Sequence, residues 1–127
     1  MGYSFLIIGE KTEAMWPSIV QRALSSLGKS TIIEEEEVET AAHKDYDLIV
    51  IDAGAVKEAA LLVARLRALL PGARIVVATA SPTWTRARDA FKSGAADYVR
   101  KSLDEAEIRA NMRAVIAVSM PPNGIEN

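Results

Sequence analysis

The chain has 127 residues, of which 50% are hydrophobic and 25% are charged, a composition typical of one globular domain with a substantial core. The formal net charge of -2 leaves no basic excess for a phosphate backbone, so direct nucleic-acid binding is not expected. Cysteine is absent, which excludes disulfides, thiol catalysis and thiolate metal sites. No apolar run can span a bilayer and the first residues lack a signal-peptide pattern, so we expect a cytoplasmic protein without membrane attachment.

Five strands and five helical segments alternate in the pattern of apolar residues. The strands are predicted from short, β-rich apolar runs at residues 3–8, 30–33, 48–51, 73–80 and 96–101. The helices are predicted from apolar spacing and boundary residues at 19–27, 38–44, 57–70, 81–94 and 104–118. We therefore expect one domain over residues 1–119, followed by a polar tail over residues 120–127.

Particular residues mark the expected ends of these segments. Gly28 stands in the position of a C-terminal cap for the first helix, and Gly94 has the same position in the fourth. Ser81 is the expected N-cap of the fourth helix, with Pro82 at its first position. The acidic run at residues 34–37 is interpreted as a solvated strand edge, with docking of a basic partner as the alternative.

Continuously apolar strands that alternate with helices are typical of a parallel sheet covered on both faces. The sequence therefore predicts an α/β protein with a doubly wound sheet. In such sheets ligands bind at the carboxyl ends of the strands, so the residues that follow each strand are candidates for a site. These residues are Gly9, Glu10, Asp52, Thr79, Ala80 and Lys101.

The side chains at these strand ends suit reversible phosphoryl transfer. Asp52 follows a strand buried on both faces, and its carboxylate can attack phosphorus if a cation neutralises the oxygens that it approaches. Glu10 can bind a magnesium ion, because Mg²⁺ prefers oxygen ligands. Lys101 can pair with the carboxylate or a phosphoryl oxygen, and the Thr79 hydroxyl can donate a hydrogen bond. Each residue alone is equally compatible with a solvated strand end.

Three segments resemble the receiver domain of two-component response regulators. Residues 46–52 (YDLIVID) resemble that family's third strand with its phospho-accepting aspartate, and residues 75–80 (IVVATA) resemble its fourth strand. Residues 91–101 (FKSGAADYVRK) resemble the segment that ends in its lysine. The resemblance covers the chain to about residue 118 and implies a flavodoxin-like fold with five parallel strands in the order 2-1-3-4-5.

The resemblance also implies roles for individual residues. Asp52 would be the phosphoacceptor, and Lys101 would contact the phosphoryl group. Thr79 and Ala80 would lie beside that group, and Tyr98 would form a switch pair with Thr79.

The expected metal site departs from the family's pattern. The resemblance implies magnesium bound by Glu10, Asp52 and the backbone carbonyl of Gly54. However, Gly9 stands where the first of two acids is expected, and Lys11 follows Glu10 directly. The loss of one negative charge beside a lysine predicts a weaker magnesium affinity than usual.

Other residues near the predicted pocket leave alternatives open. Glu13 is either a substitute metal ligand or a solvated side chain. Ser102 replaces the proline that usually follows the lysine, which removes a cis-prolyl constraint. Trp16, expected in the loop after the first strand, and Trp84, which opens the fourth helix, either flank the pocket or pack against their neighbours.

Three classes of function follow from these observations. The first is a single-domain receiver, not an enzyme beyond self-catalysed phosphoryl transfer, that accepts phosphate from a histidine kinase or phosphotransfer protein. It would signal to a downstream protein partner, and it could form a homodimer through its fourth helix, fifth strand and fifth helix. The second is a phosphorylation-independent pseudo-receiver that acts as a protein-interaction module. The third, a flavodoxin-like enzyme or nucleotide-binding domain, is weakest because no glycine-rich phosphate loop follows the first strand.

Overall fold

The computed structural model describes residues 2–12 and 15–117 of the chain. Its strands are β1 (Tyr3–Ile8), β2 (Gly28–Ile33), β3 (Leu48–Asp52), β4 (Arg74–Thr79) and β5 (Asp97–Arg100). Its helices are α1 (Met15–Leu24), α2 (Val38–Ala41), α3 (Ala59–Leu69), α4 (Trp84–Ser93) and α5 (Glu105–Ala117), with short 3₁₀ turns η1 (Glu35–Glu37) and η2 (Ala53–Ala55). The predicted tail at residues 120–127 lies outside the described residues.

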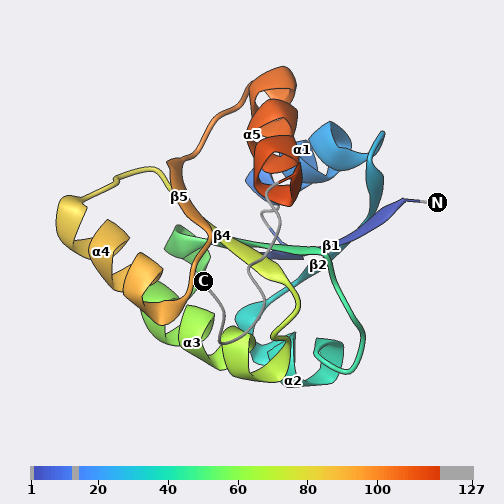
Figure 1. Cartoon of the computed structure of the whole chain (residues 1–127). Helices are drawn as coiled ribbons and strands as arrows, with labels where there is room; N and C mark the ends of the chain where they lie inside the picture. The colour runs from blue at the N-terminus through green and yellow to red at the C-terminus, as the bar shows by residue number, and fades with distance from the viewer. Residues whose placement is uncertain (1, 13–14, 118–127) are drawn as a thin grey trace.

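The sheet is parallel throughout and has the strand order β2-β1-β3-β4-β5, which confirms the predicted order. β3 pairs with both β1 and β4, and all of its residues are buried. Figure 1 shows α1 and α5 together on one face of the sheet, with α2, α3 and α4 on the other. The prediction of a doubly wound α/β fold is therefore confirmed.

The pleat of the central strands divides the core into two clusters, because alternate side chains of a strand point to opposite faces. The even-numbered residues Leu48 and Val50 of β3 pack with α1 and α5, as do their counterparts in β4. The odd-numbered residues Ile49 and Ile51 pack with α3 on the other face. At the carboxyl ends, the same alternation directs Asp52 toward the α1 and α5 face, and Thr79 toward the α3 and α4 face.

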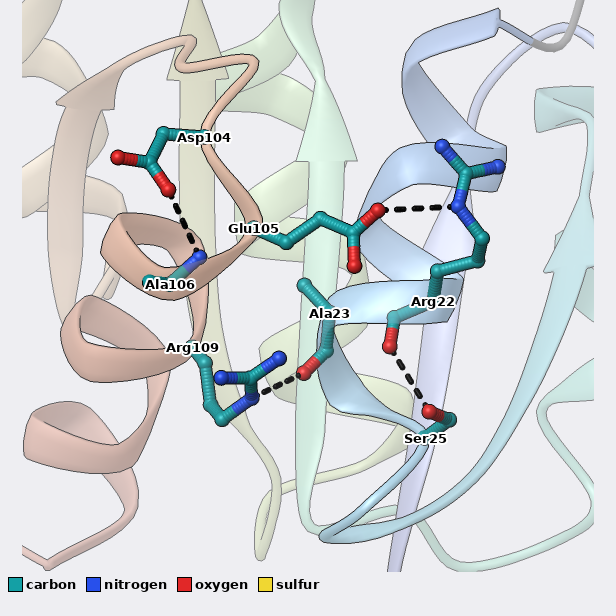
Figure 2. A network of polar contacts seen from close by, with 7 residues as sticks. All are labelled: Arg22, Ala23, Ser25, Asp104, Glu105, Ala106 and Arg109. Atoms are coloured by element: carbon teal, nitrogen blue, oxygen red, sulfur yellow. Dashed lines mark hydrogen bonds and ion pairs between the residues drawn. The ribbon is translucent and has the colours of Figure 1, made fainter.

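Polar contacts fix α5 against the end of α1 (Figure 2). Arg109 Nε donates a hydrogen bond of 2.8 Å to the carbonyl oxygen of Ala23, near the end of α1 where carbonyls lack helical partners. Arg22 Nε lies 3.0 Å from Glu105 Oε2 at the surface, where an ion pair contributes at most about 1 kcal/mol. These contacts orient the two helices, whereas the apolar cluster beneath them supplies most of the stability.

The first helix ends earlier than the sequence predicted. α1 stops at Leu24 rather than Leu27, and Gly28 begins β2 instead of capping the helix. Gly28 pairs with Tyr3 of β1, and a Cβ on Gly28 would collide with the Tyr3 carbonyl oxygen. The glycine is therefore required by the close approach of two strands.

The predicted start of the fourth helix is also wrong. Thr83 is the N-cap of α4, and its Oγ1 accepts a hydrogen bond of 3.2 Å from the Arg86 N–H. Ser81 and Pro82 lie in the preceding loop, because the Ser81 N–H donates instead to Thr79 Oγ1. The predicted end is confirmed, since Gly94 follows α4 in a left-handed conformation with φ 114°.

Among the helices within residues 2–12 and 15–117, none has the length and apolar character needed to cross a membrane.

Candidate functional site

A cleft opens at the carboxyl ends of β1, β3 and β5, on the face of the sheet that α1 covers. We call it the acid cleft; it has a volume of about 310 Å³ and is lined by Glu10, Met15, Trp16, Pro17, Asp52, Gly54, Ala55 and Lys101. The predicted site residues among these come from separate segments of the chain. The fold thus brings Glu10, Asp52, Gly54 and Lys101 together, as the sequence predicted.

Asp52 ends β3 inside the acid cleft, and only 7% of the residue is exposed. Its Oδ1 atom lies 2.6 Å from Lys101 Nζ and accepts a hydrogen bond of 3.0 Å from the Gly54 N–H. Two donors therefore offset the cost of placing a carboxylate at the end of an apolar strand.

Trp16 holds the other side of Lys101. The Lys101 Nζ lies 5.3 Å from the centroid of the Trp16 ring, within the range of a cation–π interaction. The indole Nε1–H donates a hydrogen bond of 2.9 Å to the carbonyl oxygen of Ser102. Trp16 is buried in α1, so its predicted place in a loop is wrong, but it does flank the pocket.

Pro17 closes the position where an acid is expected. Gly9 is buried, and a Cβ built on it would lie 2.8 Å from Cγ of Pro17. Such a contact requires the pyrrolidine ring to move. Pro17 therefore occupies the space that an aspartate at residue 9 would need.

Few oxygen ligands are left for a metal ion. Within the described ranges, no group of three or more acidic, cysteine or histidine side chains is placed to hold one, and Glu13 lies outside those ranges. Glu10, Asp52 and the Gly54 carbonyl still supply two carboxylates and one neutral oxygen. This set fits a weakly held Mg²⁺, because waters and phosphate oxygens usually complete its coordination shell.

The acidic run after β2 ties down two loops near the acid cleft. Glu34 accepts a hydrogen bond of 3.1 Å from the Lys11 N–H, and Glu35 accepts one of 3.1 Å from the Lys57 N–H. Lys11 Nζ pairs with Glu37 at 3.0 Å and does not line the acid cleft. Hydrogen bonds from the Glu34 backbone and from Lys11 hold the pKa of Glu37 below its ordinary value. The run lies at the surface after β2, as predicted, and its carboxylates also hold the loops after β1 and β3.

Thr79 and Tyr98 line a second cleft, on the opposite face of the sheet between α3 and α4. We call it the switch cleft; it has a volume of about 470 Å³ and is lined by Ala53, Lys57, Glu58, Ala59, Ala60, Val77, Thr79, Thr85, Arg86, Asp89, Ala90 and Tyr98. Thr79 Oγ1 accepts a hydrogen bond of 3.1 Å from the Ser81 N–H, and Tyr98 is half-buried against the core. The predicted site residues are thus divided between two clefts.

A backbone hydrogen bond connects the two clefts. The Lys101 N–H donates to the carbonyl oxygen of Thr79 at 2.9 Å. Ala80, predicted to lie beside the phosphoryl group, is exposed and lines neither cleft, although its carbonyl accepts a hydrogen bond of 3.3 Å from Arg100. Trp84 is 78% exposed and also lines neither cleft.

Several solved structures with this arrangement of strands and helices are response regulators. One from Thermotoga maritima matches with a TM-score of 0.79 and 21% identity, over 93% of this chain and 100% of the other. The chain has the receiver fold. No protein-family model and no curated protein sequence matches the chain, so the likeness lies in the structure.

Two further solved structures with the receiver fold differ in their relation to phosphorylation. A response regulator protein from Burkholderia pseudomallei, solved with a phosphorylated aspartic acid, a calcium ion and citrate, has a TM-score of 0.70 and 24% identity, over 91% of this chain and 73% of the other. An atypical orphan response regulator with a phosphorylation-independent regulatory mechanism has a TM-score of 0.74 and 21% identity, over 89% and 94%. The receiver fold therefore accommodates both modes of action.

The sequence pattern did not reveal that Trp16 and Pro17 line the acid cleft. Trp16 is spaced four residues before Val20, and both are buried on the same face of α1. Extending the apolar stripe of the first helix back to Trp16 would have placed the indole beneath the helix, next to the end of β1.

Proposed function

We propose that the chain is a receiver module that accepts a phosphoryl group on Asp52 from a histidine kinase or a phosphotransfer protein. The observation that carries this proposal is the Asp52–Lys101 pair, 2.6 Å apart in a cleft that also holds Glu10. A buried carboxylate with a fixed cation beside it suits an in-line attack on phosphorus, because the cation offsets charge on the transferred group.

The chemistry requires few steps. A carboxylate oxygen of Asp52 attacks the phosphorus atom, and the bond from phosphorus to the donor's nitrogen or oxygen breaks, which leaves an acyl phosphate. The Lys101 ammonium then faces a group that carries roughly -1.5 to -2 charges. The Gly54 N–H, which already donates to Asp52, stays beside the modified side chain.

A magnesium ion would be held by Glu10, Asp52 and the Gly54 carbonyl. When bound, it neutralises the phosphoryl oxygens during transfer. Because the protein contributes so few ligands, we expect millimolar magnesium to be needed, and this expectation separates the chain from receivers with a full set of acids.

The signal would reach the switch cleft through the strand ends. The Lys101 side chain would move with the phosphoryl group, and the Lys101 backbone N–H donates a hydrogen bond to the Thr79 carbonyl oxygen. A shift of Thr79 would change the space available to Tyr98, which would bias the surface of α4, β5 and α5 toward a second arrangement. A downstream protein partner, or a second copy of this chain, would bind that surface.

A second candidate function is a phosphorylation-independent pseudo-receiver. Pro17 against Gly9 favours it, because the proline leaves no room for the second acid without rearrangement. Trp16 favours it too, since the indole and Asp52 already satisfy Lys101. In this case a protein partner binds the unmodified surface.

Intact mass measured after incubation with acetyl phosphate distinguishes the two candidates. The receiver proposal predicts one phosphoryl adduct that depends on magnesium and is lost in Asp52→Asn, while Asp97→Asn serves as the matched control. Absence of the adduct in the folded protein, at a magnesium concentration that modifies a working receiver in parallel, would favour the pseudo-receiver.

A further inference from the structure

We propose that Trp16 is a positioning residue, which holds the Lys101 ammonium against Asp52 in a cleft where residue 9 offers no carboxylate. Its functional consequence, the rate at which Asp52 takes a phosphoryl group, rests on the proposed function. Its structural consequence, the placement of Lys101, does not.

Lys101 Nζ has one charged partner and one aromatic neighbour in the acid cleft. Its charged partner in the acid cleft is Asp52 at 2.6 Å, and the face of Trp16 lies 5.3 Å away. Glu10 also lines the cleft but is exposed and has no contact with Lys101 among the described interactions. A lysine side chain has several rotatable bonds, so a single partner fixes it poorly, whereas an indole face limits the positions open to it.

Trp16 also fixes the backbone next to Lys101. Its Nε1–H donates to the Ser102 carbonyl oxygen at 2.9 Å, across 86 positions in sequence. One residue of α1 therefore contacts both the ammonium of Lys101 and the backbone of the turn before α5.

Pro17, which follows Trp16 in α1, lies against Gly9. Pro17 fills the space beside Gly9, where a Cβ would lie 2.8 Å from Pro17 Cγ. The residue that removes room for an acid is therefore adjacent in sequence to the residue that supplies an aromatic face. The acid cleft thus has an aromatic face beside Lys101 and no carboxylate at residue 9.

The test compares Trp16→Phe, which keeps an aromatic face but loses the N–H, with Trp16→Leu, which loses both. Trp84→Phe is the matched control, because Trp84 is exposed and lines neither cleft. The readout is the NMR signal of the Lys101 side-chain ammonium, recorded at a temperature where each variant is folded. We expect the signal in the wild type and in Trp84→Phe, a weaker signal in Trp16→Phe, and none in Trp16→Leu.

A second measurement does not depend on a variant of Trp16. The chain has two tryptophans, so in a Trp84→Phe background Trp16 is the sole fluorophore. We expect Lys101→Met to change the Trp16 emission, because it removes a cation from the ring face. An unchanged Lys101 signal in folded Trp16→Leu, or an unchanged emission in Lys101→Met, would overturn the proposal.

The phosphorylation rate separates this proposal from the proposed function. If the wild type takes a phosphoryl group, we expect Trp16→Leu to slow the reaction about tenfold, the effect of losing one desolvated cation–π contact. If the wild type takes none, the proposed function fails, and the two spectroscopic readouts still decide the role of Trp16.

Discussion

The acid cleft and the switch cleft lie at the same end of one sheet but on opposite faces, and they are built differently. The acid cleft is crowded by Trp16 and Pro17, and its lysine and aspartate are already paired. The switch cleft is larger and lined mostly by small or exposed side chains, with Thr79 and Tyr98 at its edge. The pleat of one sheet can therefore separate a crowded, charged cleft from a more open one at the same strand ends.

The largest expected effect comes from breaking the pair in the acid cleft. Lys101→Met leaves the Asp52 carboxylate buried without a cation, so we expect a loss of about 3 kcal/mol in the free energy of unfolding, measured with urea. Lys92→Met, on the exposed surface of α4, is the control and should change stability by less than about 0.5 kcal/mol. Equal effects of the two variants would contradict the pairing.

The second-largest expected effect comes from placing an aspartate at residue 9, which should lower the free energy of unfolding. Gly9→Asp forces a side chain against Pro17, so we expect a loss of about 1–3 kcal/mol. Adding Pro17→Ala should recover part of it, which a double-mutant cycle measures. Gly72→Asp is the control, since a Cβ there meets nothing within 4 Å. Strict additivity of Gly9→Asp and Pro17→Ala would argue against the contact.

A change in the switch cleft should have a smaller effect and leave the acid cleft intact. Thr79→Val removes the hydrogen bond from the Ser81 N–H, and we expect a loss of about 1 kcal/mol. Thr85→Val, in the same cleft but exposed, is the control. The Lys101 ammonium signal should be unchanged in both variants, because Thr79→Val keeps the backbone hydrogen bond between the two clefts. Its loss in Thr79→Val would show that the Thr79 hydroxyl also positions Lys101.

The smallest effect concerns the acidic run that holds the loop after β1. The pKa of Glu37 is lowered from 4.5, so its carboxylate favours the folded state above pH 4.5, and this contribution is lost as the pH falls through the lower folded-state value. In a plot of melting temperature against pH, Glu37→Gln should therefore flatten the acid limb. Glu36→Gln, its exposed neighbour, should leave that limb unchanged.

The sequence predicted the fold well because strand burial and helix spacing are strong signals. Leu48 to Ile51 identified the central strand, and the residues after each strand identified the site. It misplaced Gly28 and Ser81, because a glycine needed for strand approach and a serine in a loop resemble helix boundaries.

The division of the site into two clefts was harder to predict. Asp52 and Thr79 both end strands, and only the pleat of β3 and β4 sends them to opposite faces. The contact between Pro17 and Gly9 depends on how α1 crosses the sheet, which spacing along the chain does not specify.

The most direct test of the account is an NMR titration of the full chain with beryllofluoride, a phosphoryl mimic, and magnesium. If Asp52 controls the switch cleft, the amides of Gly54 and Lys101 shift together with those of Tyr98 and α4, and Asp52→Asn abolishes every shift. Shifts confined to the acid cleft, or no response from the folded protein, would contradict the claim that Asp52 controls the switch cleft.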